Sequence, residues 1–370
     1  MKIFKLFLTF IFLLNSKLTP FTPNRVITTI PVGDTPAGSA ITPNNCFLYV
    51  ANNNNDGIPG GDSVSVINLQ TNSVIKTISD PSFNQPYTIT INASGTRAYV
   101  TNSNGSTVTI IDTSTNNVIG TITGFDGPSG FVITPDGKFA YVNNYGGPIA
   151  GSGNGTTVSI VNLSTNIIVG TITVGLAPAS LAITPDGSFV YVINYVDGNP
   201  GTGTISIIKT SSNTVVGTIA GFSGPFQIAI TPNGKFAYVT NFGSNNFFPV
   251  GTTVSVVDLS SNTISATIKV GTQPSGIAIT CDGRFAYVTN YNTLYLGPNF
   301  TNLTPGIGTV NIIDTCTNKV LCPVIIVGAS PSNITLTSNS SRAYVSDYSA
   351  NNVSVVNILD SMWLKICNKK

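Results

Sequence analysis

The stretch PSGFVITPDGKFAYV, residues 128–142, decides the fold of this chain. One apolar run precedes the tight turn Pro135-Asp136-Gly137, and a second apolar run follows it and ends near Tyr141. Two short apolar runs around a Pro-Asp-Gly turn predict a β-hairpin. The opening proline and the tyrosine lie 13 residues apart, and this interval recurs seven times: Pro36 to Tyr49, Pro86 to Tyr99, Pro128 to Tyr141, Pro178 to Tyr191, Pro225 to Tyr238, Pro274 to Tyr287 and Pro331 to Tyr344.

Two further strand-like stretches follow each of these segments. The first alternates Val or Ile with Ser, Thr or Asn, which indicates a strand with two different faces. The second follows a Thr-Asn or Ser-Asn turn, as in NVIGTI at residues 117–122. Four strands in a repeat of roughly 40 to 50 residues are typical of a propeller blade. The sequence therefore predicts an all-β, seven-bladed β-propeller with four-stranded blades, whose third strands start at Val64, Val108, Val158, Ile205, Val254, Val310 and Val353.

The two ends of the repeat region complement each other. Residues 25–30, RVITTI, repeat the pattern of a fourth strand, whereas the last repeat has only three clear strands. We therefore expect the N-terminal strand to complete the seventh blade and close the ring. The first strands contain small residues, as at 37–40 and 275–278, which suits strands that crowd around a central axis.

Variation in length is confined to one loop type. From the repeat tyrosine to the third strand the interval varies from 9 to 23 residues, whereas the other intervals are nearly constant. Insertions that all occur on one face of a repeat protein usually mark the binding face. The loops between second and third strands are therefore the first place to look for a ligand.

The repeat tyrosine opens a short motif. Residues 99–102, 238–241 and 287–290 read YVTN, and variants of it start at Tyr49, Tyr141, Tyr191 and Tyr344. The chain resembles the YVTN-repeat β-propellers of the WD40/YVTN-like superfamily, which includes surface-layer-type proteins of archaea and bacteria, over residues 25–357. The resemblance implies the propeller fold and leaves the function open, because propellers have binding, structural and catalytic roles alike.

The N-terminal region has the pattern of a secretory signal. Lys2 and Lys5 precede an apolar run at residues 6–14 that is too short to span a membrane. We expect a signal peptide at residues 1–19, a propeller at 20–360 and a tail at 361–370; an uncleaved anchor is the alternative. Cleavage removes at least Lys2 and Lys5 and therefore leaves at most 14 basic side chains against 14 acidic ones. A secreted or cell-surface protein of near-zero charge, with no membrane insertion after signal removal and no nucleic-acid partner, is predicted.

The composition excludes much of enzyme chemistry. The chain has no His, and all of its 14 acidic residues are Asp, so it has no Glu either. Ser-His-Asp and Cys-His triads, paired-Glu chemistry and His-rich metal sites are therefore impossible. Asp136, Asp186 and Asp282 fall in hairpin turns and are expected to cap them. We expect a noncatalytic protein.

Two sets of polar residues could still form a site. Asp56 and Asp62, in an Asn-rich loop, could bind calcium, which prefers oxygen ligands, although a solvated loop is the simpler interpretation and no other cofactor is indicated. The residues at the ends of the YVTN-like motifs could form a ring near the channel mouth, or could instead tie down their own loops: Asn52, Asn102, Asn144, Asn194, Asn241, Asn290 and Asp347.

Aromatic residues gather in the same region. Several directly follow the ring residues, and others lie in the two longest late loops. Exposed rings among Asn, Gly and Thr suit a glycan or a protein partner, while packing between blades is the alternative. The candidate ligand-binding residues are Tyr145, Tyr195, Phe242, Phe247, Phe248, Tyr291, Tyr295 and Phe300, with Tyr348 at the equivalent place in the last repeat.

Five cysteines permit disulfides in an exported chain without requiring them. Cys316 and Cys322 flank a predicted hairpin turn and could face each other, whereas Cys46, Cys281 and Cys367 have no evident partner.

Three functions follow from these observations. The leading hypothesis is a noncatalytic secreted or cell-surface binding or scaffold protein whose variable loops engage an extracellular glycan or protein. The alternatives are a calcium-dependent propeller hydrolase of the lactonase type and a self-assembling surface-layer or coat component.

Overall fold

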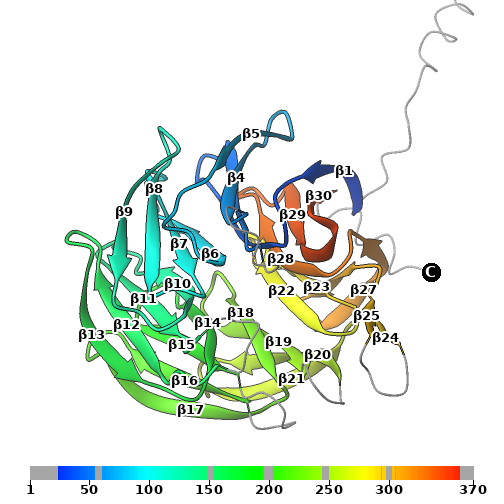
Figure 1. The fold of residues 1–370 in the computed structure, drawn as a ribbon. Helices are drawn as coiled ribbons and strands as arrows, with labels where there is room; N and C mark the ends of the chain where they lie inside the picture. The colour runs from blue at the N-terminus through cyan, green and yellow to red at the C-terminus, as the bar shows by residue number, and fades with distance from the viewer. Residues whose placement is uncertain are drawn as a thin grey trace, which may run out of the picture.

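The computed structural model describes residues 24–54, 61–147, 153–195, 203–243, 250–292 and 306–358, and the backbone of 294–296 and 302–304. These residues form seven four-stranded antiparallel sheets arranged as blades around a central axis (Figure 1). The prediction of an all-β, seven-bladed β-propeller is confirmed. We number the blades along the chain, so that blade 1 starts at Pro36 and blade 7 at Pro331.

The first two strands of each blade form the predicted hairpin. The inner strands begin at the repeat prolines: β2 (Pro36–Ile41), β6 (Pro86–Ile91), β10 (Pro128–Ile133), β14 (Pro178–Ile183), β18 (Pro225–Ile230), β22 (Pro274–Ile279) and β28 (Pro331–Leu336). The second strands carry the YVTN-like motifs: β3 (Phe47–Asn52), β7 (Arg97–Asn102), β11 (Phe139–Asn144), β15 (Phe189–Asn194), β19 (Phe236–Gly243), β23 (Phe285–Asn290) and β29 (Arg342–Asp347).

The outer half of each blade is a second hairpin. The third strands are β4 (Ser63–Asn68), β8 (Thr107–Asp112), β12 (Thr157–Asn162), β16 (Gly203–Lys209), β20 (Val250–Asp258), β26 (Thr309–Asp314) and β30 (Asn352–Asn357). The outermost strands are β5 (Ser73–Ile78), β9 (Asn117–Thr123), β13 (Ile167–Thr173), β17 (Thr214–Phe222), β21 (Thr263–Lys269), β27 (Lys319–Ile326) and, in blade 7, β1 (Arg25–Pro31).

Blade 7 is built from both ends of the chain, as the sequence predicted. Strand β1 pairs antiparallel with β30, from Arg25 opposite Asn357 to Pro31 opposite Asn352, with a bulge between Val26 and Thr28. In Figure 1 the blue β1 therefore lies beside β30 near the red end of the colour scale.

The remaining described elements are small. Strands β24 (Leu294–Leu296) and β25 (Asn302–Thr304) form a two-stranded sheet between the second and third strands of blade 6, and a 3-10 helix, η1 (Tyr348–Ala350), lies at the corresponding place in blade 7. A helix with the length and hydrophobicity needed for a membrane crossing does not occur in the described ranges.

The aspartates that the sequence assigned to turns do cap them. In the first hairpin of blade 3, Asp136 accepts hydrogen bonds from Thr134 Oγ1 at 2.6 Å and from the Lys138 N–H at 3.1 Å. The equivalent bonds from Thr184 and Ser188 lower the pKa of Asp186 to about 2. These carboxylates hold turns in place, as Asx-type residues commonly do.

The core of the protein lies between blades. The buried apolar side chains form seven clusters, and each cluster joins one blade to the next. In the cluster between blades 7 and 1, for example, Tyr344 and Val355 pack with Leu48 and Val50. A blade alone would expose these faces, so the free energy of apolar burial favours a complete ring.

The repeat tyrosine has a specific task in this packing. Its ring belongs to the apolar cluster. In five of the seven blades its hydroxyl reaches the outer turn of the following blade and donates a hydrogen bond to an Asn carboxamide. The distances are 2.6 Å from Tyr141 to Asn213, 2.8 Å from Tyr191 to Asn262, 2.8 Å from Tyr238 to Asn318 and 3.4 Å from Tyr344 to Asn72, and Tyr49 makes the same contact with Asn116.

The accepting Asn residues all have left-handed backbone conformations, with φ between 51° and 54°. Asn tolerates this region better than most residues, which explains the Thr-Asn and Ser-Asn turns of the sequence. The same residue therefore shapes the turn of one blade and binds the tyrosine of its neighbour. Burial raises the pKa of these tyrosines, to about 12 for Tyr49 and Tyr238, so their hydroxyls stay neutral donors.

Replacing Tyr191 by Phe should lower the free energy of unfolding by about 1 kcal/mol, because Asn262 then loses a donor while the apolar packing is kept. Tyr99→Phe is the matched control. Tyr99 stacks on Phe131 with ring centroids 5.1 Å apart, and its hydroxyl has no hydrogen bond to the described residues. Urea unfolding should leave the control within a few tenths of a kcal/mol of the parent. Equal losses in both variants would show that the interblade hydrogen bond contributes nothing.

Candidate functional site

The inner strands and the second strands meet at one face of the ring. Each repeat proline lies opposite the residue that ends the YVTN-like motif, from Pro36 opposite Asn52 in blade 1 to Pro331 opposite Asp347 in blade 7. The loops of variable length between second and third strands start at this same face, because neighbouring strands are antiparallel. We call it the insertion face.

The seven ring residues brace the blades from inside. Asn52 Nδ2 donates to Ser63 Oγ and to Ser65 Oγ on the third strand, both at 3.0 Å. The other five Asn side chains make the same pair of bonds, at 2.9 to 3.0 Å, to side chains of their own third strands. All seven side chains are buried, with at most 5% of their surface exposed. They do not line the channel mouth, so the amide-lined rim considered from the sequence is not what these residues form.

Asp347 is the exception among the ring residues because it carries a carboxyl group. Ser354 Oγ donates to its Oδ2 at 2.6 Å, while Oδ1 is buried without a hydrogen-bond partner. Burial raises its pKa to about 7, and the hydrogen bonds from Ser354 and the Gly328 N–H only partly oppose that shift. A carboxylate at this position is therefore less well solvated than the six carboxamides are.

Asp347→Asn should stabilise the protein at neutral and alkaline pH. The pKa of Asp347 is about 7 in the folded state against 3.8 for an unperturbed carboxyl, so the folded state holds a proton that the unfolded chain releases between these values. The parent's stability should therefore fall as the pH rises from about 4 to about 7. The variant lacks this term and should gain on the order of 2 kcal/mol at pH 8 relative to pH 4.5 in urea unfolding.

The reciprocal change Asn102→Asp provides the control, because it should introduce the same pH dependence into blade 2. If the free energy of unfolding differs between parent and Asp347→Asn by the same amount at both pH values, the raised pKa assigned to Asp347 is contradicted.

The residue after each ring residue is fixed at the mouth of the channel. Its N–H donates to the carbonyl of the residue before the repeat proline, and the distances lie between 2.9 and 3.1 Å in all seven blades. The residues before the prolines all have positive φ, as in Gln85 with 52° and Ala177 with 53°. We call the seven residues so fixed the mouth positions: Asn53, Ser103, Tyr145, Tyr195, Phe242, Tyr291 and Tyr348.

Five mouth positions are aromatic, and four of these belong to one continuous series of rings around the channel. The centroid of Phe226 lies 6.4 Å from that of Tyr195 and 5.2 Å from that of Phe242, which in turn lies 6.0 Å from Tyr291. Tyr348 follows at 6.3 Å from Tyr291. The structure therefore brings these predicted residues together across blades 4 to 7, partly buried against one another.

The remaining aromatic candidates are not part of this arrangement as far as the structure describes them. Phe247, Phe248 and Phe300 lie outside the described residues. Tyr295 is placed by its backbone in β24, opposite Leu303 of β25.

A cavity of about 640 Å³ opens at the centre of the insertion face. All seven inner strands contribute to its wall, together with the mouth positions Asn53, Ser103, Phe242, Tyr291 and Tyr348. The described lining consists of apolar, aromatic, hydroxyl and carboxamide side chains and includes no charged residue. Its size is within the range of small-molecule sites, which are about 300 to 1,000 Å³.

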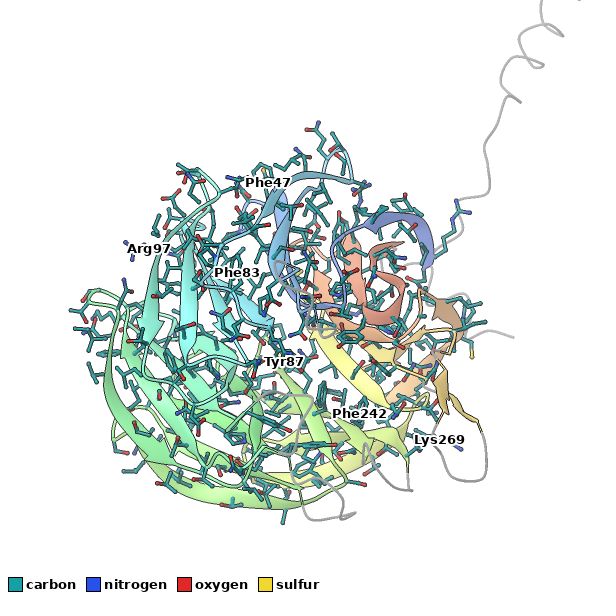
Figure 2. All side chains as sticks on the ribbon, in the orientation of Figure 1. Phe47, Phe83, Tyr87, Arg97, Phe242 and Lys269 are labelled. Atoms are coloured by element: carbon teal, nitrogen blue, oxygen red, sulfur yellow. The ribbon has the colours of Figure 1, made fainter. Side chains whose placement is uncertain are left out.

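Tyr87 is a further aromatic residue of the cavity wall. Figure 2 shows it near the axis of the ring, with Phe242 further out. Burial raises the pKa of Tyr87, and the phenol groups of Tyr145, Tyr348 and Tyr291 raise it further. These three tyrosines belong to blades 3, 7 and 6, so Tyr87 reaches a central position that several blades share.

Sequence reasoning missed Tyr87 and its counterpart Phe226. Both follow a repeat proline and read as ordinary strand residues within their own repeats. The signal appears only when the seven repeats are compared at this place, where the other blades have small residues: Ala37, Ser129, Ala179, Ser275 and Ser332.

The structure places only one of the two calcium candidates. Asp62 is half-buried, accepts a hydrogen bond from the Gln85 N–H and keeps its Oδ1 without a partner, whereas Asp56 lies outside the described residues. Burial raises the pKa of Asp62, and the hydrogen bond from the Gln85 N–H opposes that shift. Within the described ranges no three His, Cys, Asp or Glu side chains gather in a way that could hold a metal ion.

The proposed bridge between Cys316 and Cys322 is not formed. Both are exposed free thiols, as are Cys46 and Cys281, and Cys367 lies outside the described residues. Cys316 lies in the turn beyond the last pair of the hairpin, Asp314 opposite Lys319, while Cys322 lies in an irregular stretch of β27 after Leu321. The two residues are therefore not cross-strand neighbours, as a disulfide in this hairpin would need.

Comparison with known proteins supports the fold. No protein-family model matches the chain. Over 128 residues it is 34% identical to the seven-bladed beta-propeller protein Rv1057 of Mycobacterium tuberculosis, which is 34% of this chain and 30% of that protein. It is also 46% identical to PE-PGRS family protein PE_PGRS18 of the same organism over 59 residues, 16% of this chain and 13% of that protein. The matches thus span less than a third of either relative.

A solved structure resembles the whole propeller. Kuenenia stuttgartiensis hydrazine synthase superimposes with a TM-score of 0.71 and covers 93% of this chain and 99% of the matched chain, at 20% sequence identity. At this identity the likeness concerns the fold alone.

Proposed function

We propose that the protein is a noncatalytic YVTN-repeat propeller, secreted or located at the cell surface, that binds a glycan at its insertion face. The observation that carries the proposal is the uncharged cavity at this face, whose wall combines aromatic rings with carboxamide and hydroxyl groups. Aromatic faces pack against the C–H faces of sugars, and amides and hydroxyls pair with sugar hydroxyls.

The lack of charge in the lining argues for this ligand over its competitors. A phosphate-bearing or otherwise ionic ligand would lose water there without meeting an opposite charge, which costs several kcal/mol. Nucleic acids are held mainly by clustered Lys and Arg, and no such residue borders the described cavity. A protein partner would need a wider contact than the cavity itself gives, so it is the alternative that a binding experiment must separate.

The side-chain inventory supports a noncatalytic role. The chain contains no His and no Glu. The buried carboxyl of Asp347 accepts a hydrogen bond within its own blade, and the exposed carboxyl of Asp186 caps a turn. Secretion is supported by the basic start and the short apolar run within residues 1–19.

The purified protein, screened on a glycan array, should retain neutral glycans, and the retention should persist in EDTA. Thermal unfolding with and without calcium is the parallel measurement, because a bound cation would raise the melting temperature. A calcium-dependent signal would favour the hydrolase or a metal-dependent binder. Ordered arrays in electron microscopy without glycan binding would favour the coat component.

Expression of the full chain in a secreting host tests the location. The exported protein should begin near residue 20 and lack Lys2 and Lys5, which N-terminal sequencing and intact mass would show. Full-length protein retained in the membrane fraction would instead support the uncleaved anchor.

A further inference from the structure

The inner strands of the seven blades are alike at most positions, but they differ at the position after the repeat proline. Five blades have Ala or Ser directly after the repeat proline, while blade 2 has Tyr87 and blade 5 has Phe226. Three steps around a seven-membered ring separate these two blades, so their inner strands stand almost opposite each other across the axis. Both side chains belong to the cavity wall. Where the other blades have a small residue, these two blades have aromatic rings that border the central space from opposite sides.

Polar groups beside these two rings can still form further hydrogen bonds. The hydroxyl of Tyr87 makes no hydrogen bond within the described part of the chain, although three other phenols lie near it. Gln227, next to Phe226, uses its Oε1 to accept the Ile277 N–H at 2.7 Å, which leaves its Nε2 as a donor. Gln85 contributes a further carboxamide at the mouth.

The cavity therefore offers two apolar faces and several neutral polar groups in an enclosed space. A neutral pyranose ring needs this combination, since its C–H faces and its hydroxyls must both find partners when water is removed. All seven blades border the central cavity, so a long glycan chain could enter it only end first.

We propose that the central cavity binds the uncharged terminal sugar units of a glycan end-on, with the sugar rings packed against Tyr87 and Phe226. This inference rests on the proposed function and specifies where on the insertion face the glycan binds and which part of it is recognised. The mouth residues Phe242 and Tyr291 then contact the units that follow the terminal one.

Isothermal titration of the secreted protein with neutral cello-, malto-, manno- and N-acetylchito-oligosaccharides tests the proposal, with sialyllactose and oligogalacturonate as charged probes. At least one neutral series should bind, and the charged probes should not. Tyr87→Ala and Phe226→Ala should each weaken binding at least tenfold. Tyr87→Phe keeps the ring and should weaken binding about fivefold, which corresponds to the loss of one neutral hydrogen bond. Ala179→Phe places a third aromatic ring in the cavity wall and should abolish binding by filling the space.

The matched control is Phe139→Ala. Phe139 is a partly exposed ring at the start of β11, at the end of the blade opposite the insertion face, so its removal should leave the affinity unchanged. Melting temperatures identify any variant that fails to fold. If Tyr87→Ala fails to fold, Tyr87→Phe still tests the role of Tyr87.

The outcomes separate the two proposals. Binding that survives Tyr87→Ala, Phe226→Ala and Ala179→Phe would place the glycan elsewhere on the surface and overturn this inference, while the proposed function would stand. Preference for oligosaccharides attached through both ends would do the same. Preference for the charged probes would contradict both proposals, because both rest on the uncharged cavity. If no oligosaccharide binds the parent protein, both proposals fail.

Discussion

The structure depends on apolar burial between neighbouring blades. Each of the seven core clusters joins two adjacent sheets, so no sheet can bury its apolar faces alone and the ring must be complete. The tyrosine-to-asparagine hydrogen bonds, such as that of Tyr191 with Asn262, add direction to a contact that is otherwise nondirectional. The channel and its cavity exist because seven sheets packed in this way leave a space at the axis.

The repeat made most of the fold predictable, for physical reasons that the structure shows. The proline recurs because it opens each inner strand. The tyrosine recurs because its ring packs between blades and, in five of the seven, its hydroxyl also bonds to the next blade. Their spacing therefore records a whole hairpin. The role of the seven ring residues was harder to predict, because it depends on which face of the strand is buried inside the blade. Asn52 lies against two serine hydroxyls inside its blade, and sequence alone does not distinguish that position from the channel wall.

The candidate site was predicted at its rim and missed at its centre. Tyr145, Tyr195, Phe242 and Tyr291 drew attention because they follow a motif at a loop. Tyr87 and Phe226 lie within strands, and their significance depends on the distance across the ring, which no local pattern encodes. The predicted pairing of Cys316 with Cys322 is wrong for a different reason. Cys316 lies in the turn that follows the last pair, Asp314 opposite Lys319, so the register of this hairpin cannot place it opposite Cys322.

The pairing of β1 with β30 has a consequence for synthesis. On the ribosome β1 is made before blades 1 to 6, yet its partner strand β30 is made after them. Blades 1 to 6 can stack in order as they emerge, but both flanks of blade 7 stay uncovered until β28, β29 and β30 have been made. Contacts between residues so far apart in the chain form slowly. The nascent protein therefore spends its longest interval as an open arc, and the seam of blade 7 is where a chaperone would find exposed apolar surface.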